Sequence, residues 1–197
     1  MKNTLALAGL CLSIAACATA VNPLDDYEEV TATTIFDAPH ATVVAPEDRE
    51  ALARGRYLVE LLGCGACHTD GALLGEANME RWLAGSRVGI AYTNPMEYER
   101  PGIVFPPNIT PDEDTGIGTW SDREIAAAVR TGSGRHGKGR IVVMPWQGYS
   151  KISDNDMMAM VGYLRSIEPV NFRVPENVPP GRRTSEQYVH FGVYRSR

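Results

Sequence analysis

The pattern Cys64-Gly65-Ala66-Cys67-His68 constrains this chain more than any other feature. It places two thiols three positions apart, with an imidazole directly after the second thiol. The chain of 197 residues contains four cysteines, and the other two lie near its start, at positions 11 and 17. Any interpretation of the fold therefore has to account for Cys64, Cys67 and His68 together.

The C-x-x-C-H spacing is typical of covalent attachment of a c-type haem. Two thiols at this spacing add to the two vinyl groups of one haem, and the following histidine presents a ring nitrogen to the iron. A thioredoxin-like dithiol lies between a strand and a helix, whereas here a helical pattern precedes the motif. A zinc site needs further Cys or His ligands nearby, and a disulfide leaves His68 unexplained. We therefore expect one haem c, held by Cys64, Cys67 and His68.

The first residues of the chain have the pattern of an export signal. Lys2 precedes an apolar run from Leu5 to Ala16, and small residues follow it, as in a secretory signal peptide. The run has 12 residues, which is too short to cross a bilayer as a helix, since that takes about 20. The mature protein is therefore expected to be exported to the bacterial periplasm.

Two cleavage positions fit this signal. Residues 14–17 resemble a bacterial lipobox, in which the cysteine becomes the lipid-modified first residue of the mature chain. Residues 18–20 fit an ordinary A-x-A cleavage site. We favour the first, because it places Cys17 where lipid attachment requires a cysteine. Residues 1–16 are then the signal peptide, and a lipid on Cys17 anchors the protein to a membrane.

The composition divides the rest of the chain into three parts. Residues 17–45 are predicted to be an extended acidic arm, since residues 21–50 carry eight acids and one arginine. Residues 46–168 contain the helical patterns and the C-x-x-C-H motif, and are expected to fold as one domain. Residues 169–197 carry five arginines and several prolines. Because this basic tail also has aromatic residues, we expect it to be an extended strap over the domain or over a partner.

Helical signals surround the C-x-x-C-H motif. A helix is expected from Pro46, with acids in its first turn, to Gly63. Gly55 inside it is unfavourable by about 1 kcal/mol relative to alanine, which suggests a close helix contact there. A capping box at residues 121–124 predicts a second helix, and Ser153 begins a third that ends before Pro169. Residues 69–120 are rich in turns, with a short helical piece at 79–83, and no useful β-alternation is present.

The chain resembles the class I cytochrome c domain, and most of all the single-haem domains that accompany bacterial dehydrogenases. The resemblance covers most of residues 49–168. It implies an all-α cytochrome c fold, with three to five helices around one covalently bound haem and extended N- and C-terminal segments. It also implies that the first and last helices cross near Gly55 and Tyr163. The stretches that carry it are residues 54–58, 64–68, 108–112, 115–122, 144–146 and 162–166.

A second axial ligand for the haem iron is also expected. A methionine thioether is the usual choice in an electron-carrying cytochrome c. Pro145 holds Met144 in an extended conformation that can point at a metal, and the family resemblance places the ligand at this same Met-Pro. We therefore expect His68 and Met144 as the two axial ligands. Met79 and Met96 are the alternatives, and His136, in a glycine-rich loop, is a rival that would give bis-histidine coordination.

The charge pattern bears on the partners of the chain. A net charge of −5 argues against a nucleic-acid-binding protein. Residues 125–153 carry no acid. The basic loop in this stretch leads into Met144, so it is expected to border the haem. Their charges can steer an acidic redox protein or pair with the haem propionates, and both interpretations stay open. The basic residues concerned are Arg130, Arg135, Lys138, Arg140 and Lys151.

These features predict a mono-haem cytochrome that transfers single electrons and is not itself an enzyme. Its partners would be redox proteins: a dehydrogenase, a respiratory complex or a terminal oxidase. The alternative is a fixed electron-relay subunit of a membrane respiratory or dehydrogenase complex. A haem peroxidase or gas sensor fits less well, because filled axial positions leave a substrate no open coordination site.

Overall fold

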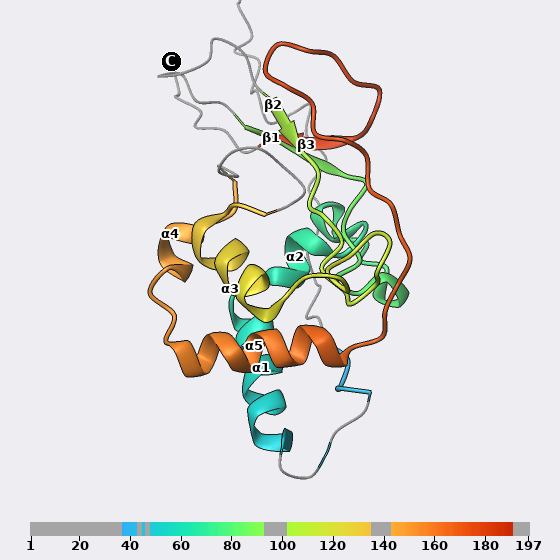
Figure 1. Ribbon diagram of the computed structural model, residues 1–197. Coiled ribbons are helices and arrows are strands. Elements are labelled where there is room, and N and C mark those ends of the chain that lie inside the picture. The colour runs from blue at the N-terminus through green and yellow to red at the C-terminus, as the bar shows by residue number, and fades with distance from the viewer. Residues whose placement is uncertain (1–36, 43–44, 46–47, 93–101, 135–142, 191–197) are drawn as a thin grey trace, which may run out of the picture. The chain divides into compact units, whose positions relative to one another are not determined.

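The computed structural model describes residues 37–42, 45, 48–92, 102–134 and 143–190 (Figure 1). These residues belong to one unit of the chain, Thr31–Arg197. The predicted signal peptide, Cys17, most of the acidic arm, Met96 and His136 lie outside the described residues.

Long helices are found at the three stretches where the sequence predicts them, and the described residues form two further short α-helices. The α-helices are α1 (Arg49–Leu61), α2 (Cys64–His68), α3 (Asp122–Thr131), α4 (Trp146–Tyr149) and α5 (Asp154–Ser166). The 3-10 helices are η2 (Ala72–Leu74) and η3 (Met79–Arg81), the second of which lies where a short helical piece was expected.

Side-chain caps begin α3 and α5, as the sequence predicts. The Ser121 hydroxyl accepts a hydrogen bond from the Glu124 N–H at 3.3 Å. The Glu124 carboxylate accepts in turn from the Ser121 N–H at 2.8 Å, which completes the capping box. At the start of α5, the Ser153 hydroxyl accepts from the Asp156 N–H at 3.1 Å.

Helices α1 and α5 cross in close contact (Figure 1). At the crossing, a Cβ atom added to Gly55 would lie 2.0 Å from the backbone oxygen of Ala159 and 3.0 Å from the Cβ of Tyr163. Only a residue without a side chain lets the two backbones approach this far. The close contact predicted at Gly55, and the crossing near Tyr163, are therefore confirmed.

The described residues also form a small β-sheet. The all-α prediction did not include this sheet. Strands β1 (Gly89–Tyr92), β2 (Gly102–Val104) and β3 (Tyr188–His190) have the spatial order β2-β1-β3. β1 pairs antiparallel with β2 and parallel with β3. Strands of three or four residues are too short to show alternation, and the residues of β2 are all buried, so the period-2 signal is missing.

The main hydrophobic core lies between α1, α3 and α5, and a second cluster lies against the sheet. The second cluster contains Ala91, Ile103 and Phe105, with Val174 and Val178 packed against it. None of the described helices has the length and apolar character to cross a membrane. Buried members of the main core include Val59, Trp82, Leu83, Ile125, Met157, Met160, Val161, Tyr163 and Leu164.

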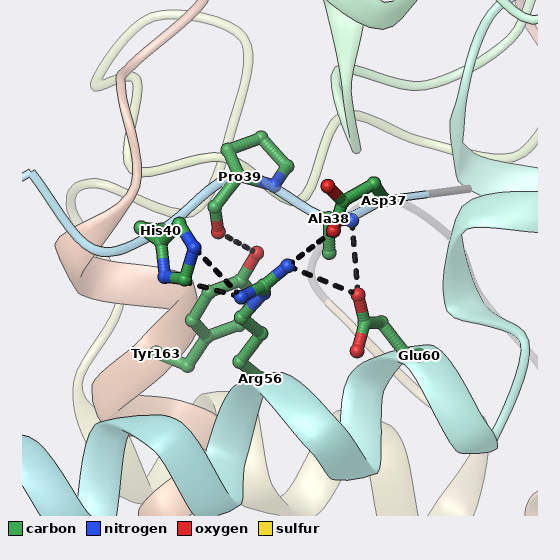
Figure 2. A network of polar contacts seen from close by, with 7 residues as sticks. All are labelled: Asp37, Ala38, Pro39, His40, Arg56, Glu60 and Tyr163. Carbon is green, nitrogen blue, oxygen red and sulfur yellow. Dashed lines mark hydrogen bonds and ion pairs between the residues drawn. The ribbon is translucent and has the colours of Figure 1, made fainter.

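The end of the predicted arm packs on the α1–α5 crossing (Figure 2). The Tyr163 hydroxyl donates to the Pro39 carbonyl at 2.8 Å, and the Ala38 N–H donates to the Glu60 carboxylate at 2.9 Å. Ala38 itself is only 1% exposed. Residues 37–42 are therefore part of the folded domain, although they were predicted to belong to the arm.

Arg56 on α1 holds the same segment through its charge (Figure 2). Its guanidinium lies 2.5 Å from the Asp37 carboxylate, 3.5 Å from that of Glu60 and 3.1 Å from the ring nitrogens of His40. The side chain is 19% exposed, so these contacts are partly shielded from water.

The described part of the tail also packs on the domain. After α5, the chain runs to β3 (Figure 1), and on the way Val178 and Ile103 exchange two backbone hydrogen bonds of 2.8 and 2.9 Å. The side-chain oxygen of Asn177 accepts from the Phe105 N–H at 2.8 Å. Residues 177–178 and β3 therefore pack on the domain itself, and contact of the tail with a partner stays a prediction.

Candidate haem site

Helix α2 brings the three predicted site residues into one short helix. Cys64 and Cys67 are separated by three positions, which places both thiols on one helical face. Both are free cysteines, and both are half-buried. His68 is the last residue of the helix and follows Cys67 directly.

Glycines explain how the chain reaches this arrangement. Gly63 has a φ of 69°, a left-handed conformation that ends α1 and turns the chain into α2. Gly65 packs against the indole of Trp82, since a Cβ there would lie 2.3 Å from a ring carbon. Ala66, the other residue between the cysteines, is exposed. The two intervening positions thus have different roles: one allows close packing and the other faces solvent.

The imidazole of His68 is oriented by a backbone carbonyl. Its Nδ1 lies 2.8 Å from the carbonyl oxygen of Pro107. A carbonyl only accepts, so Nδ1 carries the proton and Nε2 keeps a free lone pair. Burial lowers the pKa of His68, and the hydrogen bond to Pro107 acts in the opposite direction. The result is a neutral imidazole with one nitrogen available to a metal.

The two thiols are held in their protonated form. Burial raises the pKa of Cys64 to about 12, with a smaller contribution from neighbouring Cys67. Burial also raises the pKa of Cys67. Reactive dithiols of the thioredoxin type depend on a lowered pKa. The shifts of both cysteines are thus opposite in direction to the one that activates a redox dithiol.

The donor set fits a c-type haem better than a zinc ion. In the described part of the chain, no three or more His, Cys, Asp or Glu side chains gather around a common point. A zinc site needs such a cluster. Covalent haem attachment instead needs two thiols on one face and one neutral imidazole after them, and α2 supplies these three groups. Cys64 and Cys67 would hold the haem, and His68 would ligate its iron.

Met144, the expected second axial ligand, belongs to a different part of the chain from α2. It lies just before α4 and is half-buried. Its carbonyl accepts from the Trp146 N–H at 2.8 Å, which joins it to the helix. Among the other methionines, Met79 is 39% exposed in η3, whereas Met157 and Met160 are core residues of α5, each 1% exposed.

Tyr149, at the end of α4, connects the Met144 segment to the C-x-x-C-H motif. Its hydroxyl donates to the carbonyl of Leu62 at 2.9 Å, just after α1 and two residues before Cys64. The pKa of Tyr149 is raised to about 12, mainly by burial and secondarily by the nearby Cys64 and Cys67. The Tyr149 side chain thus lies near the two thiols. No motif in the sequence indicates this residue.

The basic stretch expected beside the haem is only partly described. Arg130 donates to the Asp154 carboxylate at 2.7 Å and to the Ile152 carbonyl at 2.8 Å, and these bonds connect α3 to the start of α5. The positive charge of Arg130 is therefore paired with a carboxylate of the same domain. Arg135, Lys138 and Arg140 lie outside the described residues, so their expected role stays a prediction.

Comparison with known proteins identifies relatives of this domain. No family model matches the chain. It is 36% identical over 126 residues to a subunit of the nicotinate dehydrogenase of Pseudomonas putida, which covers 64% of this chain and 9% of the relative. It is 29% identical over 149 residues to the fructose dehydrogenase cytochrome subunit of Gluconobacter japonicus, covering 75% of this chain and 28% of the relative.

A third relative has a similar description. The chain is 31% identical over 137 residues to the cytochrome c subunit of a quinone-type alcohol dehydrogenase of Gluconobacter oxydans, covering 68% of this chain and 25% of the relative. The chain thus spans between 9% and 28% of the length of these three proteins. All three are dehydrogenase subunits, and two of them are described as cytochrome or cytochrome c subunits, which supports a cytochrome c-like family.

Proposed function

We propose that this chain is a cytochrome c that holds one covalently attached haem and transfers single electrons. The observation that carries the proposal is the geometry of α2. Two free thiols lie on one helical face, and the hydrogen bond of His68 to the Pro107 carbonyl leaves Nε2 available to iron. The sequence contains one C-x-x-C-H motif, which supports a single haem. The cytochrome c fold is part of the same proposal.

Met144 is proposed as the second axial ligand. Pro145 limits the backbone of Met144, and Tyr149 connects α4 to Leu62, two residues before Cys64. A thioether ligand raises the reduction potential of a c-type haem. With both axial positions filled, a substrate has no free coordination site, so the proposed role is electron transfer within an oxidoreductase system.

Location in the periplasm rests on the sequence. Residues 1–16 have the pattern of a signal peptide, and Cys17 lies where lipid would be attached. A lipid anchor of this kind would keep the domain near a membrane. Mass spectrometry of the mature N-terminus distinguishes lipid on Cys17 from cleavage after Ala20.

A dehydrogenase is the partner that the homologues support. Two modes of association are proposed: a tethered carrier that meets its partners transiently, and a fixed relay subunit of a membrane complex. Detergent extraction followed by purification separates them. A fixed subunit co-purifies with a dehydrogenase, whereas a carrier is recovered as a monomer without a stable partner.

Optical and EPR spectra of the purified protein test the proposed ligands. We expect six-coordinate low-spin haem in the wild type, and loss of this state in Met144→Ala, because the only thioether ligand is removed. Met79→Ala is the matched control and should leave the spectra unchanged. A five-coordinate high-spin wild type would contradict the proposal and favour a sensor or peroxidase. An unchanged Met144→Ala spectrum would mean that another residue is the second axial ligand.

A further inference from the structure

The C-terminal strap, defined here as residues 169–178, lies against the loop that orients His68. Val170, in the strap, and Asn108, in the loop, are 62 positions apart in the chain, yet the Asn108 amide donates to the Val170 carbonyl at 2.7 Å. Asn108 directly follows Pro107, whose carbonyl binds the His68 ring. Val170 in the strap is thus connected to the His68 ring through Asn108 and the Pro107–Asn108 peptide bond.

Asn108 is a buried side chain with every polar group paired. It is 1% exposed. Its second amide N–H donates to the Thr115 hydroxyl at 2.8 Å, and its oxygen accepts from the Thr110 N–H at 2.9 Å and the Thr110 hydroxyl at 2.8 Å. A buried amide that uses both donors and two acceptor positions has one orientation. Its backbone is fixed with it.

The same two threonines also bind the strap. The Val170 N–H donates to the Thr110 hydroxyl at 3.2 Å, and the Phe172 N–H donates to the Thr115 hydroxyl at 3.0 Å. Thr110 is fully buried. Asn108, Thr110 and Thr115 therefore form a polar cluster that joins the strap to the loop, and the cluster uses backbone groups of the strap as partners.

A second contact connects the strap to His68 from another side. The Gly85 N–H donates to the His68 carbonyl at 2.8 Å. A Cβ on Gly85 would lie 2.6 Å from a methyl of Val174 in the strap and 2.8 Å from the backbone nitrogen of Asn108. The strap, Gly85 and Asn108 are therefore packed together without space between them, next to the backbone of the histidine.

We propose that Asn108 is a positioning residue for the haem ligand, and that the C-terminal strap is the support on which it rests. The proline ring fixes φ of Pro107, and the side-chain hydrogen bonds of Asn108 restrict the far side of the same peptide group. Together they hold the Pro107 carbonyl in line with Nδ1 of His68. This inference rests on the proposed haem-binding function.

The proposal has a measurable consequence for the haem. A hydrogen bond from Nδ1–H to a fixed carbonyl increases the basicity of a metal-bound imidazole, which favours ferric iron. Loosening the carbonyl weakens that bond. The Nδ1 proton then exchanges faster with water, and the midpoint potential becomes more positive.

The test uses the full-length, haem-loaded protein with three substitutions. Asn108→Ala removes all four hydrogen bonds. Asn108→Asp keeps the shape of the side chain but places an oxygen against the Val170 carbonyl. Thr110→Val, a change of similar shape, removes the Thr110 hydroxyl and with it the bonds to the Asn108 oxygen and from the Val170 N–H. Asn177→Ala is the matched control, since it breaks a strap-to-loop bond to the Phe105 N–H, two residues before Pro107, and leaves the four side-chain bonds of Asn108 in place.

We expect the Asn108 variants to exchange the His68 Nδ1 proton at least tenfold faster in NMR spectra of the haem protein. We also expect the equilibrium with a redox mediator to shift at least threefold toward the reduced form, which is about 28 mV. Thr110→Val should shift both quantities less, in the same direction. Asn177→Ala should lower stability and leave both quantities at their wild-type values.

Two results overturn the inference while the proposed function stands. One is haem-loaded Asn108 variants with wild-type proton exchange and potential. The other is an Asn177→Ala variant that shifts both quantities as far as Asn108→Ala, which would mean general loosening. If the Asn108 variants do not fold, the proton exchange and potential of Thr110→Val, compared with those of Asn177→Ala, test the inference instead. A wild-type chain without covalent haem overturns the proposed function and this inference together.

Discussion

Tyr149 is the residue whose role is least expected from the sequence. Its hydroxyl binds the Leu62 carbonyl across 87 positions of the chain. Leu62 follows α1, where backbone carbonyls have no partner within the helix. One side chain therefore satisfies the end of α1 and holds α4, with Met144 before it, near the two thiols.

Replacing Tyr149 with phenylalanine tests this connection. The Leu62 carbonyl loses its donor, so the free energy of unfolding should fall by about 1 kcal/mol. The absorption band of methionine-ligated ferric haem should also weaken, because α4 is less firmly held. Urea unfolding and the optical spectrum measure the two effects. Tyr57→Phe is the control, since Tyr57 is 50% exposed, and it should leave the optical band unchanged.

The sequence predicts the residues that would bind the haem, but not the contacts that orient those residues. Cys64, Cys67 and His68 are found from spacing alone, because the haem requires that spacing. The Pro107 carbonyl is not, since every residue has a carbonyl. Its pairing with a ring 39 positions away depends on the folded loop. The same holds for the contact of Trp82 with Gly65, which no local pattern indicates.

At the scale of elements, the crossing of α1 and α5 depends on a single missing side chain. We expect Gly55→Ala to destabilise the domain by at least about 2 kcal/mol, because the new Cβ meets backbone rather than a flexible side chain. Gly162→Ala on α5 is the matched control. Its Cβ would lie 3.4 Å from a Leu52 methyl, an ordinary contact.

The control should be neutral or stabilising by up to about 1 kcal/mol, because alanine is the better helix former. Thermal and urea unfolding of the two variants measure the difference. Equal effects of Gly55→Ala and Gly162→Ala would contradict the close crossing.

An ion pair at the edge of the same crossing gives a dependence on pH. The Arg54 guanidinium on α1 lies 2.9 Å from the Asp156 carboxylate on α5. The hydrogen bond from Arg54 lowers the pKa of Asp156 below its ordinary value. A lowered pKa in the folded state stabilises the protein above the unfolded pKa. This contribution disappears as the pH falls through the folded value.

A double-mutant cycle measures this contribution. The substitutions are Arg54→Gln and Asp156→Asn, alone and together, with the coupling energy taken from unfolding at several pH values. We expect a favourable coupling at pH 7 that vanishes in acid, when the carboxyl is protonated. Coupling that persists unchanged at low pH would contradict the assignment to charge.

The elements differ in how far the sequence predicts them. Helices α3 and α5 are indicated by their N-caps, and Gly55 indicates the crossing. The sheet is not predicted, because β3 comes from the tail and joins β1 across about 100 positions. Strand pairing over such a separation leaves no local signal in strands of three or four residues.

At the scale of the whole molecule, the segments predicted to be extended become parts of the domain where the structure describes them. Residues 37–42 pack on α1 and α5, and the strap supplies backbone partners to buried Asn108, Thr110 and Thr115. Composition identifies both segments as irregular. The aromatic residues of the tail indicate packing, but composition does not indicate which groups either segment binds, because the contacts are mostly backbone groups of the segment bound to side chains far away in the chain.

The central claim is that this domain holds one haem through Cys64 and Cys67. The most direct measurement is the intact mass of the protein, exported from a host with a cytochrome c maturation system. We predict the mass of the mature chain plus one haem that resists acid extraction, and its loss in the double variant Cys64→Ala/Cys67→Ala. A wild-type mass without haem, with two haems, or with haem that persists in the double variant would contradict it.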